Sequence, residues 1–98
     1  MADWIYFIHA PRENFASTMT PEEGEVWDRH FDRLTTMHRD GVLVLAGPTL
    51  GTINTGIVIF EAPTEDAARE IMEEDPVLRE GFARGELREF RVSLLKGR

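Results

Sequence analysis

The sequence predicts an α+β protein in which two helices cover one face of a four-stranded antiparallel sheet. Four short segments are rich in aromatic and β-branched residues, which favour strands. Two other segments begin with a threonine that can cap a helix, next to proline and acidic residues. These segments follow one another in the order β-α-β-β-α-β. A chain of 98 residues accommodates one core, so we expect a single domain over residues 1–98.

The first strand is expected at residues 4–9, where aromatic and β-branched side chains are dense. The polar residues 11–18 have no clear pattern and are interpreted as a loop. The first helix is expected to begin at Thr20, which can cap it, because Pro21 suits the first helical position and Glu23 stands three residues after the cap. This arrangement is typical of a capping box.

The helix is expected to end near Asp40, because Gly41 can adopt the left-handed conformation that terminates helices. The apolar residues 42–46 predict the second strand. A turn is expected from Gly51 to Asn54, and the third strand at residues 55–61.

The second helix is expected to begin after Thr64 and to end at Asp75, because Pro76 disfavours a helical residue before it. A short helical turn and loop over residues 77–84 should lead to the last strand at residues 86–95. Right-handed connections then place the first and third strands in the centre of the sheet. This is the ferredoxin-like split βαβ arrangement, with both helices on one face.

The composition excludes several kinds of partner. The chain has 11 Lys and Arg against 18 Asp and Glu, a net charge of −7, so we expect neither nucleic acid nor an anionic membrane as a partner. No apolar run approaches the ~20 residues that span a bilayer. The first residues lack the basic segment of a signal peptide, and there is no cysteine. We therefore expect a cytoplasmic protein without disulfides.

Both faces of the predicted central strands are apolar. In residues 4–8 and 57–60, successive side chains point to opposite faces, and large apolar side chains occur on each. Helices cover only one face, so the other would expose four or five large side chains. We therefore expect a homodimer through the helix-free sheet face. The alternative is a monomer with a ligand in an open groove of the sheet.

Two of the three histidines lie in the apolar stripe of the first helix, and His9 ends the first strand. With Leu34 at zero, His30 falls at about −40° and His38 at about +40°. An inward-facing imidazole needs a partner, and a core histidine bonded to a backbone carbonyl competes with a functional one. His30 and His38 lie about 12 Å apart along the helix, too far for one metal ion. No third ligand spacing stands out, so we expect no metal site.

Asp75 has two interpretations. An aspartate before proline commonly caps a following helical turn. A carboxylate at this place can also orient a histidine that transfers protons.

Several short motifs, each weak by itself, occur in a specific order and spacing. They are residues 18–23 leading to residues 29–31, residues 45–48, residues 56–61, Ala67-Ala68 and Asp75-Pro76. Together they resemble the YCII-related family of small proteins of the dimeric α+β barrel class, over about residues 4–95.

The resemblance implies a His–Asp pair in a cleft, which the family is proposed to use in catalysis. Matched by position, the pair is His30 and Asp75. Gly47 and Pro48 would form a wall of the cleft. Thr55 stands close to where some relatives carry serine and could supply a hydroxyl group for substrate binding.

Two functions follow from the resemblance and the residues. The first is a cofactor-independent enzyme in which His30, oriented by Asp75, is the general acid/base for isomerisation, elimination or hydrolysis of a small cyclic or aromatic molecule. No cofactor motif is present, and none is expected. The alternative is a non-catalytic dimer that binds a small ligand or has a regulatory role. An enzyme should place His30 in a pocket within hydrogen-bond distance of Asp75.

Overall fold

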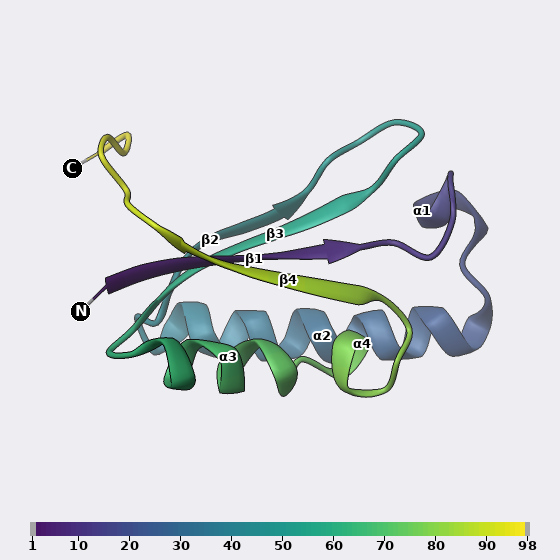
Figure 1. Ribbon diagram of the computed structural model, residues 1–98. Helices are drawn as coiled ribbons and strands as arrows, with labels where there is room; N and C mark the ends of the chain where they lie inside the picture. The colour runs from purple at the N-terminus through teal and green to yellow at the C-terminus, as the bar shows by residue number, and fades with distance from the viewer. Residues whose placement is uncertain (1, 98) are drawn as a thin grey trace.

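The computed structural model describes residues 2–97. It contains strands β1 (Ala2–His9), β2 (Leu43–Pro48), β3 (Thr55–Ala62) and β4 (Arg84–Phe90), and helices α1 (Phe15–Thr18), α2 (Pro21–Arg39), α3 (Glu65–Glu73) and α4 (Pro76–Arg79). The strands form one antiparallel sheet in the order β2-β3-β1-β4. Helices α2 and α3 lie on one face of it (Figure 1). The predicted order of elements and the central position of β1 and β3 are confirmed.

The capping box predicted at the start of α2 is present. The Thr20 hydroxyl accepts the backbone N–H of Glu23 at 3.1 Å, and the Glu23 carboxylate accepts the N–H of Thr20 at 2.9 Å. Arg12 also donates to Glu23, at 2.8 Å, and so ties the chain before the helix to its first turn. The expected loop over residues 11–18 is wrong in part, because α1 lies within it.

The buried face of α2 differs from the predicted stripe. Val26 and Leu34 are 1% and 8% exposed, whereas Phe31 is 68% exposed and His38 is also exposed. The helix packs on the sheet through the side of the stripe toward Val26, at about −80° from Leu34. His30 lies within that side, and the inward position expected for His38 is wrong.

Helix α3 begins where it was predicted, whereas the last strand ends earlier than predicted. Thr64 caps α3 by accepting the N–H of Ala67 at 3.1 Å. The last strand, expected at residues 86–95, runs from Arg84 to Phe90. Among residues 2–97, β1 is its only neighbour in the sheet, and the pairing ends at Asp3 opposite Phe90. Residues 91–95 therefore have no strand to pair with, although their sequence favours one.

The core lies between the sheet and the helices. Tyr6, Ile8, Val58 and Phe60 are at most 3% exposed and belong to the main apolar cluster. The helix-free face is apolar as well, but its centre is already shielded within one chain, since Ile5 and Ile59 are each 7% exposed. Phe7 and Ile57 beside them are half-buried, and Leu45 on β2 is 42% exposed.

None of the helices in the described part of the chain combines the length and the apolar character that crossing a membrane requires.

Candidate active site

The carboxylate of Asp75 is completely buried and accepts hydrogen bonds from three elements. His30 on α2 approaches with Nδ1 at 2.9 Å from Oδ1 and 2.8 Å from Oδ2. The hydroxyl of Tyr6 on β1 donates to Oδ2 at 2.6 Å. The N–H of Val77, in the first turn of α4, donates to Oδ1 at 3.2 Å. Asp75 is therefore both the cap of α4 and the hydrogen-bond partner of His30.

This arrangement fixes the imidazole of His30. A carboxylate only accepts hydrogen bonds, so Nδ1 must carry a proton and donate it toward Asp75. The side chain of His30 is 11% exposed and that of Asp75 is 0% exposed, so water does not compete for the contact. In the neutral imidazole Nε2 then has a free lone pair, and in the imidazolium it carries a proton that it can give up.

Tyr6 holds the far side of the same carboxylate. Burial raises the pKa of Tyr6 well above its ordinary value, and the nearby charge of Asp75 raises it further, while the Arg33 guanidinium opposes this. The phenol therefore keeps its proton and remains a donor. Its ring packs edge-on against Phe60, with the centroids 5.7 Å apart.

Local sequence explains how these elements meet. Pro76 is the first residue of α4 and disfavours a helical conformation in the residue before it. Asp75 therefore stands between the end of α3 and the start of α4. Arg29, the neighbour of His30, donates to Glu80 at 2.8 Å and so ties α2 to the end of α4. Arg33, one turn beyond His30, donates to the carbonyl of Ile71 at 2.7 Å and ties α2 to α3. His30 is thus held from both sides.

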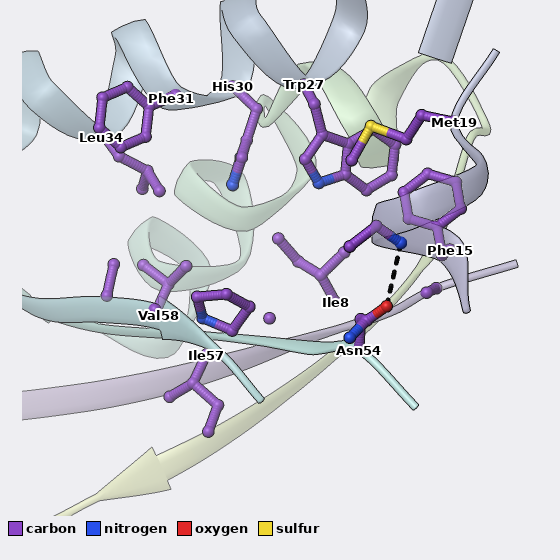
Figure 2. A pocket seen from close by; sticks show the side chains of 16 residues that line it. Ile8, Phe15, Met19, Trp27, His30, Phe31, Leu34, Asn54, Ile57 and Val58 are labelled. Carbon is purple, nitrogen blue, oxygen red and sulfur yellow. Dashed lines mark hydrogen bonds between the residues drawn. The ribbon is translucent and has the colours of Figure 1, made fainter. Parts of the chain in front are cut away.

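A cavity of about 330 Å³ lies between α2, the chain before it and strands β2 and β3 (Figure 2). His30 and Trp27 point from α2 toward the strands, and their rings meet at an angle of 61° with centroids 6.4 Å apart. Phe15 packs against Trp27 at 4.6 Å and extends the aromatic wall. The lining is otherwise almost entirely apolar, and no Lys, Arg, Asp or Glu contributes to it.

The structure places the residues expected at the cleft as follows. His30, Gly47 and Pro48 line the cavity, and Asp75 lies behind His30. Thr55 does not line it, although its neighbours on both sides do. Since adjacent strand residues point to opposite faces, the side chain of Thr55 lies outside this cavity.

The other two histidines are not part of this site. His9 lies on the helix-free face, where its ring stacks on Phe7 and Nε2 lies 3.1 Å from a carboxylate oxygen of Glu86. His38 is exposed on α2. Among residues 2–97, no group of three or more His, Asp and Glu side chains is placed to hold a metal ion.

Tyr6, Trp27 and Asn54 were not expected at the site. For Tyr6 a signal exists, because alternation along β1 places it on the helix-covered face, where a buried tyrosine hydroxyl needs an acceptor. Trp27 fits equally well as a core residue of the helix. Asn54 follows a turn, and its side chain accepts a hydrogen bond from the N–H of Ala16, which is too far away in the sequence for a local pattern to indicate.

The chain is similar to known proteins over almost its whole length. The family model described as YCII-related domain matches residues 4–91. The solved structure of 5-chloro-2-hydroxyhydroquinone dehydrochlorinase (TftG) from Burkholderia phenoliruptrix AC1100, in complex with 2,5-dihydroxybenzoquinone, superimposes with a TM-score of 0.68. The match covers 93% of this chain and 94% of that one, at 19% sequence identity, and therefore concerns the fold. No curated protein sequence matches the chain.

Proposed function

The chain belongs to the family of YCII-related domains, and from this we propose that it is a cofactor-independent enzyme in which His30 is the general acid/base and Asp75 orients it. One observation carries the proposal. A fully buried carboxylate lies 2.8 Å from Nδ1 of His30, and the same imidazole lines an apolar cavity large enough for a small molecule. A group held in one tautomer beside a cavity is what proton transfer requires.

The substrate class follows from the cavity. Its volume of about 330 Å³ is at the lower end of the range for small-molecule sites. Aromatic side chains form one wall, Gly47 and Pro48 form another, and no charged side chain other than an imidazolium of His30 is available to bind a carboxylate or phosphate. We therefore propose a small, uncharged cyclic or aromatic substrate.

The reaction is proposed to be an isomerisation, elimination or hydrolysis that begins with proton abstraction. Neutral His30 takes the proton at Nε2 and becomes an imidazolium, which Asp75 stabilises. In an isomerisation the electron pair left on the substrate shifts into a new double bond, and in an elimination it forms a double bond while the leaving group departs with its own electron pair. In a hydrolysis His30 takes the proton from a water molecule instead, whose oxygen bonds to the substrate and displaces the leaving group. The proton on Nε2 is then returned to the product or to water. The structurally similar dehydrochlorinase supports an elimination, and the quinone in its structure supports a ring-shaped ligand.

The test combines binding and turnover. Hydroquinone, a ring that is uncharged at neutral pH, serves as the binding probe, and chloride release from 5-chloro-2-hydroxyhydroquinone, within a panel of halogenated rings and lactones, measures turnover. We expect His30→Asn to lower turnover by about 10²–10⁴-fold while probe affinity changes little. Turnover that is equal in wild type and His30→Asn would refute the catalytic role. Binding without turnover of any ring in the panel would instead favour the ligand-binding or regulatory alternative.

We also propose that the protein is a homodimer through the helix-free sheet face. Within residues 2–97, the long helices α2 and α3 lie on the opposite face of the sheet (Figure 1). On this face Phe7, Ile57 and Leu45 leave an apolar surface that is partly exposed. A sheet face that leaves large apolar side chains partly exposed marks an interface more often than a solvated face.

A further inference from the structure

The indole N–H of Trp27 is a hydrogen-bond donor without an acceptor in the described part of the chain. Figure 2 shows its nitrogen directed from α2 toward the strands, into the cavity that His30 lines. The other tryptophan differs, since Trp4 donates its indole N–H to the carbonyl of Ala62 at 3.3 Å. Tryptophan N–H groups in apolar surroundings normally have a partner. The indole N–H of Trp27 is therefore free to donate a hydrogen bond to a ligand that enters the cavity.

The remaining polar side chain of the lining is already occupied. Asn54 accepts the N–H of Ala16 at 3.0 Å (Figure 2), and its amide group lies 3.2 Å from the carbonyls of both Thr49 and Gly51. Its hydrogen bonds hold the cavity together and leave it little capacity for a ligand. Trp27 and His30 thus carry the side-chain nitrogens that a ligand can reach.

We infer that Trp27 is a ligand-binding residue that donates its indole N–H to an oxygen atom carried by the ring of the ligand. This inference rests on the proposed function and narrows its substrate class to rings bearing a hydroxyl or carbonyl oxygen. The rings of Trp27 and His30 lie 6.4 Å apart, so one small ring can contact both. The indole would then fix the oxygen while Nε2 of His30 acts on a neighbouring position of the ring.

Two probes of nearly equal shape test the inference. Phenol carries the oxygen acceptor and toluene does not. In ¹H–¹⁵N spectra of the wild-type protein, we expect phenol to shift the indole N–H signal of Trp27 downfield and toluene to leave it near its free position. The indole signal of Trp4, which is bonded to Ala62, is the internal control and should not move with either probe.

The Trp27→Phe variant measures the size of the contribution. It keeps an aromatic wall and removes the donor. We expect phenol affinity to fall about tenfold, which is the effect of losing one hydrogen bond. Toluene affinity should fall less, because toluene loses only the packing contacts that the smaller phenylalanine ring cannot make. Trp4→Phe is the matched control. If both probes shift the lining resonances while the Trp27 indole responds equally to the two, the inference is overturned and the cavity remains a ligand site. If neither probe perturbs any lining residue, the proposed function fails together with it.

Discussion

Nδ1 of His30 lies 2.8 Å from Oδ2 of Asp75, across 45 residues of sequence and between two helices. The contact is made at a carboxylate with no exposed surface, and each carboxylate oxygen has a further donor. Asp75 therefore cannot rotate away from the imidazole without leaving the Tyr6 hydroxyl or the Val77 N–H unpaired. This makes the tautomer of His30 a property of the fold.

Asp75→Asn should reverse that tautomer. The amide oxygen is expected to stay toward the N–H of Val77, because a backbone N–H can only donate, whereas the Tyr6 hydroxyl on the other side can rotate and accept from the NH₂ group. The NH₂ group then faces His30 and donates to Nδ1, so the ring proton moves to Nε2. Nε2 can no longer accept a proton, and turnover should fall by about 10²–10⁴-fold.

Two-bond ¹H–¹⁵N spectra of the imidazole rings report the tautomer directly. His9 and His38 serve as internal references, since neither contacts Asp75. A His30 ring that keeps its proton on Nδ1 in the Asp75→Asn variant would show that the two residues are not coupled as described.

Tyr6→Phe tests the donor on the other carboxylate oxygen. The variant keeps the edge-on packing against Phe60 but leaves a buried carboxylate short of one hydrogen bond. Hydrogen bonds to charged groups contribute about 1.5–3 kcal/mol, and we expect a loss of this size in the free energy of unfolding. Because Tyr6 does not line the cavity, kcat should fall while ligand affinity is unchanged.

Trp4→Phe is the control for this variant. It lies two residues away on the same strand and face, and it loses a buried hydrogen bond that does not involve Asp75. Denaturant titration should show both variants destabilised, with the kcat effect confined to Tyr6→Phe. An equal loss of kcat in both would mean that Tyr6 acts only through stability.

The protein should lose stability in acid, because the charge of Glu23 stabilises the folded state and is lost there. Hydrogen bonds from Arg12, and then from the N–H of Thr20, lower the pKa of Glu23 from 4.5 to about 2. A carboxylate with a depressed pKa in the folded state stabilises it above its unfolded pKa, and this contribution is lost as the pH falls toward the folded value. The window is therefore from pH 4.5 down to about 2.

Unfolding curves at several pH values test this. Glu23→Gln should be less stable than wild type at pH 6, and the difference should shrink steadily as the pH falls through that window. Glu22→Gln, on the adjacent exposed residue, should show no such convergence. A stability difference for Glu23→Gln that stays constant with pH would contradict the assigned role of its charge.

Local signals account for the parts of the fold that were predicted. Thr20 and Thr64 each cap the helix whose start they indicate, and alternation in β1 and β3 identifies the two faces of the central strands. The end of β4 has no such signal, because it depends on where β1 begins in space. The start of α1 also lacks one, since Asn14 makes no side-chain cap there.

Of the residues that form the site, His30, Asp75, Gly47 and Pro48 were predicted. His30 and His38 are equivalent on a helical projection, and only the packing of α2 on the sheet separates them. The residue pattern allowed a structural or a functional role for each of His30 and Asp75, and the resemblance to the YCII-related family favoured the functional one. Tyr6 and Trp27 belong to patterns that a core explains equally well, so their roles become visible only when their polar atoms are traced to a partner or to the cavity.

A lysine in place of Ile57 should dissociate the proposed homodimer. Ile57 points away from the helices, toward the helix-free face (Figure 2), and is half-buried in a single chain. A lysine there can extend its ammonium group into water in the monomer, so Ile57→Lys should still fold. In a sheet-to-sheet dimer the same charge is buried without a partner, at a cost of several kcal/mol.

Light scattering should then show wild type at twice the 11.2 kDa of one chain and Ile57→Lys at 11.2 kDa. Thr35→Lys, which adds the same charge on the exposed side of α2, should remain dimeric. A wild-type protein of one chain mass at micromolar concentration would refute the dimer, and a dimer that survives Ile57→Lys would place the interface on another surface.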